Sequence, residues 1–293
     1  MAFHIRNGRS IERELGRLAR DEFRTALEQL GESHPDEEAI HDARKSLKKI
    51  RAVLRLVEPA LGSEYRDQNE QLRAAAHSLG ALRDADVTAA TIEALQGRYS
   101  TVITESMARQ VEGNLRRRHR GLETREPRLV NRATPVLRRL QEQTPQDIRE
   151  AARFKIVRRA VRDGYRRARK ALADVQLDSD AALVHLFRRR VKNHWYQMRL
   201  LECIHPTPRR RARTLRQLDA HLGDDHNLAL LRAALLEGGS DIAPAETSAL
   251  LLGCIDKRQT TLRKRALKVA GRLLRRRPKD FDRSLRRWWR DRA

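Results

Sequence analysis

Basic side chains recur at steps of three and four residues in the stretch from Ile40 to Val57, IHDARKSLKKIRAVLRLV. At that spacing they share one face of a helix, since successive residues turn by about 100°. The set consists of His41, Arg44, Lys48, Arg51 and Arg55, flanked by Lys45 and Lys49. Like charges one turn apart destabilise a helix by about 0.2–0.5 kcal/mol per pair, and Asp42 is the only acid in the stretch. The pattern is therefore typical of a helix face whose charge is balanced by a bound anion.

A second stretch, Val184 to Leu201, repeats the pattern without a gap. The equivalent residues are His185, Arg188, Arg189, Lys192 and Arg199, while Asn193 and Trp195 stand where the first stretch has Lys49 and Arg51. Two further segments match at nearly the same offset of about 142 to 144 residues, including Leu79-Gly80 with Leu222-Gly223. Just beyond these glycines Arg83 corresponds to His226, and both join the candidate anion ligands. The sequence thus predicts an internal duplication.

These motifs resemble the CHAD family, a helical domain named for its histidines. The family pattern His-x-x-Arg-x-x-x-Lys-x-x-Arg is read at residues 41–51 and again, without its last arginine, at residues 185–192. The resemblance covers nearly the whole chain. It implies two four-helix bundles related by a pseudo-twofold, whose basic helices line a shared surface that binds inorganic polyphosphate. Some members also carry a triphosphate-tunnel domain marked by Glu-x-Glu-x-Lys, a motif that does not occur here, so a stand-alone CHAD domain is expected.

Composition favours a polyanion as partner. The formal net charge is +24 over 293 residues, and such a field attracts anions and opposes self-association. No run approaches the roughly 18 apolar residues of a membrane span, and the first ten residues lack the apolar core of a signal peptide. Cys203 and Cys254 fit small buried residues in a reducing compartment. We expect a cytoplasmic protein recruited to polyphosphate granules, with no cofactor and no structural metal; the oligomeric state stays open.

Periodicity and helix-breaking residues predict an all-α fold. In the first half we expect helices from Ser10, as N-cap, to Leu30, then the basic helix ending near Pro59, then 63–79, 85–96 and 101–123. Prolines at 127, 135 and 145 then indicate a link to the second half, so the predicted units are residues 1–145 and 146–293. The second half should repeat this order, with breaks at Pro206 and Pro208, at Gly223, at Gly238-Gly239 and at Pro244.

The apolar side of each basic helix predicts the core. We expect one buried face made of Ala43, Leu47, Ile50, Val53, Leu54 and Val57, and an equivalent face with Val191 and Met198. The two basic faces would then look outward from their bundles. A pseudo-twofold would bring His41 and His185 to one groove. Whether these histidines donate to phosphate or only fix a neighbouring side chain stays open.

Several residue groups allow a second interpretation. His41-Asp42 is the pair found in metal phosphohydrolases, but adjacent helical residues point about 100° apart and cannot share an ion as a pair. His221, Asp224, Asp225 and His226 could ligate a metal, although a turn with a helix cap is the favoured reading because the matching first-half residues cannot ligate. Asp84 and Asn227 cap a helix, orient an arginine, or contact the anion.

Three functions are compatible with these features. Binding of linear polyphosphate is favoured, because that ligand asks only for rows of Arg and Lys. Nucleic-acid binding is the alternative, although only 4% of residues are aromatic and base stacking normally uses aromatic platforms. An enzyme of polyphosphate metabolism would need clustered carboxylates beside the basic faces, which neither stretch carries. Trp288 and Trp289 near the C-terminus suit a membrane or nucleic acid, or indoles docked on the bundle.

Overall fold

The structure is a computed structural model, and it describes residues 3–31, 35–79, 84–123 and 126–292. The helices are α1 (Ile11–Leu30), α2 (Glu37–Leu54), α3 (Glu58–Leu61), α4 (Ser63–Ser78), α5 (Asp84–Arg98), α6 (Glu105–Glu123), α7 (Glu126–Ala151), α8 (Phe154–Leu177), α9 (Ala181–Leu200), α10 (Pro206–Gly238), α11 (Ala245–Leu273) and α12 (Pro278–Arg290), with the 3-10 turn η1 (Gly239–Asp241). No strand occurs within these described ranges. The predicted all-α class is confirmed.

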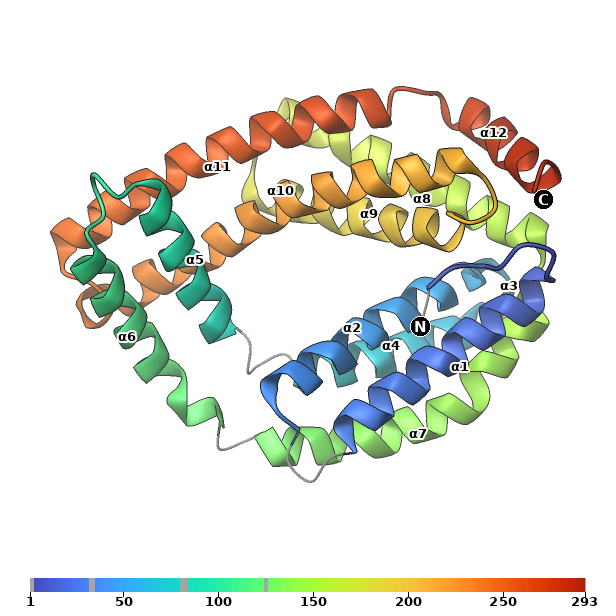
Figure 1. Cartoon of the computed structure of the whole chain (residues 1–293), viewed down its shortest axis with the longest axis horizontal. Coiled ribbons are helices and arrows are strands. Elements are labelled where there is room, and N and C mark those ends of the chain that lie inside the picture. Colours follow the sequence, from blue (N-terminus) through green and yellow to red (C-terminus); the bar gives the residue numbers. More distant parts are fainter. Residues whose placement is uncertain (1–2, 32–34, 80–83, 124–125, 293) are drawn as a thin grey trace.

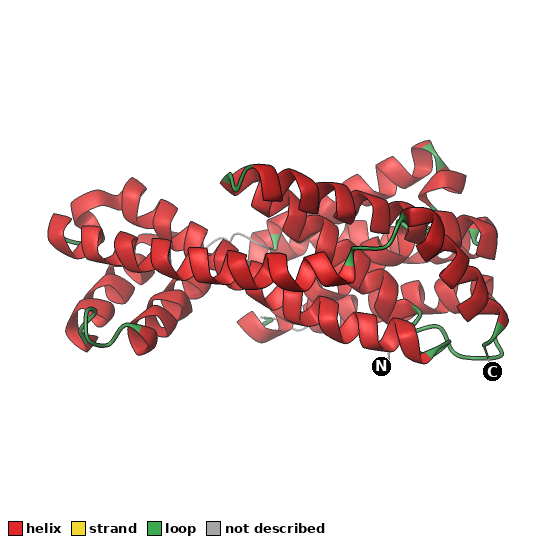
Figure 2. Ribbon diagram, turned by 90° about the horizontal axis from the view of Figure 1, so that it is seen from above, coloured by secondary structure: helices red, strands yellow, loops and turns green. Residues whose placement is uncertain are grey.

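The helices gather in three places (Figure 1). α1 packs against α2 and α7, and α4 packs against α7, in the lower right of the view. α9 packs against α8 and α10 above them, where α12 also covers α8. α5 and α6 pair with each other at the left, beside the far ends of α10 and α11. Figure 2 shows the elongated molecule that results, with one narrower end.

Buried apolar residues form two clusters that do not divide between the halves of the sequence. The larger cluster joins α1, α2, α4 and α7 with α8, α9 and α12. The smaller cluster joins Ile92 of α5 and Leu115 of α6 with Leu231 of α10 and Ile255 of α11. Residue 145, where we expected the boundary, lies inside α7. The two halves therefore share apolar contacts, and the internal duplication stays a prediction.

The first basic helix forms where its sequence predicts, but it ends at Leu54 rather than near Pro59, and Glu58–Leu61 forms the separate short helix α3. Asp36 is the N-cap of α2, and its carboxylate accepts a hydrogen bond from the Ala39 amide at 2.8 Å. The predicted core face is fully buried, with Ala43, Leu47, Ile50, Val53, Leu54 and Val57 all at 0% exposure. In α9, Val191 and Met198 are likewise at 0%. Burial of these faces leaves the cations of both helices on the opposite side, as expected.

The expected break at Gly223 is wrong. α10 runs without interruption from Pro206 to Gly238, and Asn227 lies in its interior, so it caps no helix. A glycine inside a helix costs only about 1 kcal/mol relative to alanine. Leu218 and Leu222 before Gly223 and Leu228 after it are all buried, so one apolar face continues past the glycine and outweighs that cost. The matching residues 80–83 lie outside the described residues.

The expected proline-rich link is also wrong, because Pro135 and Pro145 lie inside the helix α7. A proline removes one helical hydrogen bond, and packing must compensate for it. α7 lies close against α1: a Cβ at Gly16 would stand 2.9 Å from the Pro145 carbonyl oxygen. The absence of a side chain at Gly16 allows this approach. The other expected breaks are confirmed, since α10 begins at Pro206, α10 ends at Gly238, and Pro244 caps α11.

Candidate anion-binding site

The basic face of α2 is partly buried rather than fully solvated. Arg44, Lys48 and Arg51 are half-buried there, and His41 is half-buried one turn earlier. Arg51 donates from Nε to the Asn69 amide oxygen of α4 at 3.0 Å. Burial lowers the pKa of Arg51, and the charge of Arg55 lowers it further. The fold thus holds Arg51 in a position that disfavours its charge.

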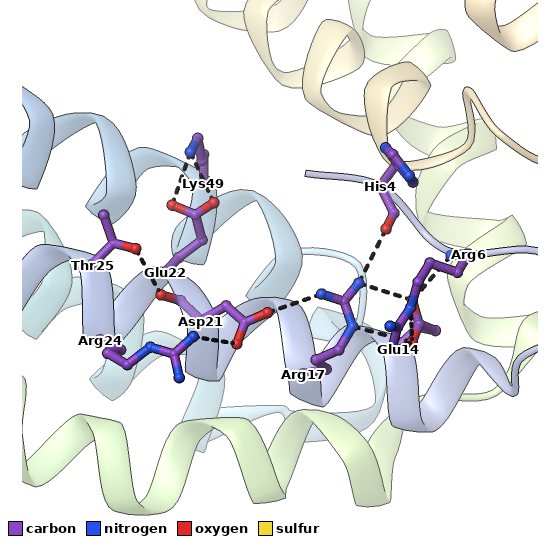
Figure 3. A network of polar contacts seen from close by, with 9 residues as sticks. All are labelled: His4, Arg6, Glu14, Arg17, Asp21, Glu22, Arg24, Thr25 and Lys49. Atoms are coloured by element: carbon purple, nitrogen blue, oxygen red, sulfur yellow. Dashed lines mark hydrogen bonds and ion pairs between the residues drawn. The ribbon is translucent and has the colours of Figure 1, made fainter. Parts of the chain in front are cut away.

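Lys45 and Lys49 differ from the rest of the predicted set, because each has a carboxylate partner. Lys45 is exposed and lies 2.9 Å from Asp42 of its own helix. Lys49 donates to both oxygens of Glu22 in α1, at 2.8 and 2.9 Å (Figure 3). The Glu22 side chain is only 7% exposed. The charge of Lys49 is therefore already balanced within the fold and stabilises the contact between α1 and α2.

On the second basic face, His185 of α9 meets His226 of α10. Their ring centroids are 4.9 Å apart. Burial lowers the pKa of His226 to about 4, with further lowering by the charge of Arg188 and then by His185 and Lys192. Partial burial likewise lowers the pKa of His185, although much of this side chain stays exposed. Both imidazole rings are neutral at pH 7. They do not balance the positive charges of Arg188 and Lys192 beside them.

The two basic helices meet near the end of α2. Arg55 donates from Nη1 to the Asn193 amide oxygen of α9 at 2.6 Å. Burial lowers the pKa of Arg190 beside them, and the charges of Arg167 and Arg55 lower it further. Arg189 contributes a weaker effect of the same sign on Arg51. Cations from both predicted faces therefore lie close enough to repel one another.

A cavity of about 580 Å³ opens at this meeting point. It lies between α2, α3 and α4 on one side and α8 and α9 on the other. Its charged lining residues are Arg55, Arg66, Arg159, Arg166, Arg167 and Arg190, with Glu58 and Asp163. Asp163 also lies 3.3 Å from Arg162 and 3.6 Å from Arg166. Cations outnumber carboxylates threefold in this lining, so the cavity favours an anionic occupant.

Sequence reasoning predicted only Arg55 among these six arginines. Arg66 and Arg190 lie outside the compared motif positions, and Arg159, Arg166 and Arg167 lie in α8. The signal in α8 is the spacing of Arg159, Arg162 and Arg166, which gives a basic stripe like that of α2. From the sequence, we predicted only that this segment belongs to the internal duplication. The tertiary fold, not the motif, brings it beside α2 and α9.

Lys192 and Arg199 do not line this cavity, and both have contacts elsewhere. Lys192 lies 3.5 Å from Asp219 of α10. The Arg199 guanidinium lies 5.4 Å from the centroid of Phe3 and 5.2 Å from that of Trp195, within cation–π range. The Ile5 amide donates to the Leu200 carbonyl at 2.9 Å, so the N-terminal segment binds to the end of α9. Arg83 lies outside the described residues.

The acids and histidines near residue 221 do not converge on one point. Asp225 is 3% exposed and accepts from Arg263 Nε at 2.8 Å. Asp224 lies 4.0 Å from Arg258, and the His226 ring faces His185. Within the described ranges, no three His, Cys, Asp or Glu side chains lie where they could hold a metal ion.

The C-terminal tryptophans pack on the bundle. Trp288 is 2% exposed and meets Phe281 edge-on, with centroids 5.9 Å apart. Trp289 stacks on Phe154 of α8 at 4.4 Å. This confirms the docked-indole interpretation of α12. Of the helices that the structure describes, none is long and apolar enough to cross a membrane.

These observations define a class of protein: all-helical, with an arginine-lined cavity where two basic helices meet. The model of the CHAD domain family matches residues 14–236, and the chain belongs to that family. The crystal structure of the CHAD domain from the plant Ricinus communis is similar, with a TM-score of 0.68 at 17% identity, covering 94% of this chain and 95% of that one. The search of curated proteins found no match. The expected family and the all-α fold class are thereby confirmed.

Proposed function

We propose that this protein binds inorganic polyphosphate at the junction of α2 and α9. The observation that carries the proposal is the cavity of about 580 Å³, whose lining holds three times as many arginines as carboxylates. Burial and mutual repulsion lower the pKa values of Arg51 and Arg190 in the unliganded fold. A bound polyanion would relieve that repulsion, because each phosphate supplies the negative charge that the surrounding protein lacks.

The chemistry of the lining suits a chain of phosphates. Arginine presents a planar fork of donors that can bind two phosphate oxygens at once. The cations come from several helices, so they can contact successive phosphates of one chain. His185 and His226 lie outside this lining, on the second basic face, and can donate once protonated. We propose that polyphosphate binding localises the protein to polyphosphate granules in the cytoplasm.

Nucleic acid remains the alternative ligand, and aromatic residues argue against it. Single-strand binding proteins stack bases on exposed aromatic rings. Here Trp288 is buried, Trp289 is stacked on Phe154, and Trp195 is covered by Arg199. The lining of the cavity contains one aromatic residue, Tyr65, which is 9% exposed. A ligand without bases suits this surface better.

We also propose that binding occurs without turnover. Metal-assisted phosphoryl transfer needs carboxylates that hold magnesium beside the phosphate. Of the two carboxylates in the cavity lining, Asp163 is flanked by Arg162 and Arg166. Incubation with magnesium or manganese should leave polyphosphate length unchanged on a gel. Phosphate release that disappears in Lys48→Ala would instead indicate an enzyme.

A titration at one salt concentration tests the ligand class. Long-chain polyphosphate, tripolyphosphate and duplex DNA should be compared at equal phosphate concentration, because all polyanion complexes weaken as salt rises. We expect long-chain polyphosphate to bind most tightly and tripolyphosphate far more weakly, since only a long chain reaches both faces. Equal or tighter binding of DNA would contradict the proposal.

A further inference from the structure

The outer face of α8 continues beyond the first cavity as a second basic surface. Arg166, Arg169, Lys170, Ala173 and Gln176 are all exposed on it. Their spacing of three and four residues places them along one side of the helix. Neither predicted basic face includes these residues.

A second cavity, of about 540 Å³, lies on this side of α8, next to the end of α11 and the start of α12. Its lining residues with charged or polar side chains are Arg166, Arg169, Lys170, Arg275 and Gln176. Leu172 and Leu274, at 6% and 1% exposure, form its apolar part. Among the residues that the structure describes, this lining contains four cations and no carboxylate. An anion is the occupant that this composition favours.

One of the four cations of this second cavity, Arg166, lies 3.6 Å from Asp163, but in the described part of the chain the other three are not balanced by neighbouring acids. Across the described residues, Arg169, Lys170 and Arg275 form no ion pair, whereas Arg158 of the same helix pairs with the largely buried Asp282. Pro278, the first residue of the 13-residue helix α12, also lines the cavity. The amide end of that helix adds to the positive potential.

Arg166 lines both cavities. The two sites therefore share a wall. On the basis of the proposed function, we infer that a long polyphosphate chain continues from the first cavity over Arg166 into the cavity between α8, α11 and α12. This second site extends the binding surface to the α8 cations and to Arg275, so the chain contacts more cations than the duplicated faces supply.

The occupant is a chain of condensed phosphate rather than a nucleic acid, because the lining of the second cavity contains no aromatic side chain on which a base could stack. A single inorganic phosphate could use the second cavity alone. A continuous chain gains from both sites at once, since binding at the first raises the effective concentration at the second. Dependence on chain length is thus the property that distinguishes a continuous track from an isolated phosphate site.

The first test compares two triple variants in polyphosphate titrations. One replaces Arg169, Lys170 and Arg275 by Gln; the control replaces Arg20, Arg132 and Arg138, which are exposed on α1 and α7 and line neither cavity. Each triple lowers the formal net charge of +24 by three. The α8 variant should lose about tenfold or more in affinity for long chains and little for tripolyphosphate. The control should lose much less for either ligand.

The second test uses Gly271, which lines the second cavity and at which an added Cβ meets no atom within 4 Å. Gly271→Glu adds a carboxylate to the lining from a position with room for the new Cβ and should weaken long-chain binding, while Gly271→Ala should not. If the α8 triple behaves like its control, or Gly271→Glu like Gly271→Ala, the second site is wrong and the proposed function stands. Wild-type protein that binds no polyphosphate would contradict both.

Discussion

Arg55 at the end of α2 donates a hydrogen bond to Asn193 in the middle of α9, a residue 138 positions later in the chain. This contact joins the two basic helices, and the arginine-lined cavity opens beside it. Asn193 stands where the first stretch has Lys49. A neutral acceptor at this position lets the helices approach, whereas a second cation would repel Arg55.

The histidine pair predicts tighter polyphosphate binding at acidic pH. His226 has a pKa of about 4 in the unliganded fold, so it is neutral at pH 7. A bound polyanion favours the protonated ring and raises that pKa, so binding takes up a proton and affinity rises as the pH falls from 7 towards 4. His226→Gln should flatten this dependence by up to about tenfold per pH unit. Equal slopes in wild type and variant would contradict a histidine role in binding.

His194 predicts a loss of stability in acid. This side chain is 0% exposed in α9, and burial lowers its pKa from 6.5 to about 3. The unfolded chain therefore binds a proton that the folded chain refuses, so the free energy of unfolding falls as the pH decreases from 6.5 towards 3. The slope from this residue is at most about 1.4 kcal/mol per pH unit. Denaturant unfolding at several pH values should show a shallower slope for His194→Gln.

Adjacent lysines of α2 should separate stability from binding. Lys49→Met leaves Glu22 largely buried without its partner and should destabilise the fold by about 1–3 kcal/mol. Lys48→Met changes the basic face instead and should weaken polyphosphate binding more than Lys49→Met does. Unfolding curves and titrations of both variants check this. Replacing Glu22 by Gln in the Lys49→Met background should recover stability; failure to recover it would mean that the ion pair is not the cause.

Periodicity was sufficient to predict α2 and its buried face, because six apolar residues agree on one side of a helix. Helix-breaking residues were less reliable as predictors of where helices end. Pro145 and Gly223 sit inside helices, since packing against α1 and a continuous apolar face outweigh local preference. The identity of a single proline or glycine cannot show which tertiary contacts compensate for its low helix propensity.

The candidate site, like the fold, could be predicted only in part from local sequence. The spacing of cations identified Arg55 and the basic faces, but could not show that Glu22 of another helix neutralises Lys49. Nor could it place Arg159 and Arg167 beside α2, because this proximity depends on how α8 packs against α9. Residues that share a motif were found; residues brought together by the fold were not.

The most direct test of the account is a comparison of three triple variants in long-chain polyphosphate titrations. Alanine at Arg55, Arg66 and Arg190, which line the cavity, or at Arg44, Lys48 and Arg51 of the α2 face, should each weaken binding by about tenfold or more. Alanine at the exposed C-terminal residues Arg286, Arg287 and Arg290 removes the same charge and should do much less. If the C-terminal variant loses as much affinity as the other two, net charge governs binding, and the assignment of the site to α2 and α9 is wrong.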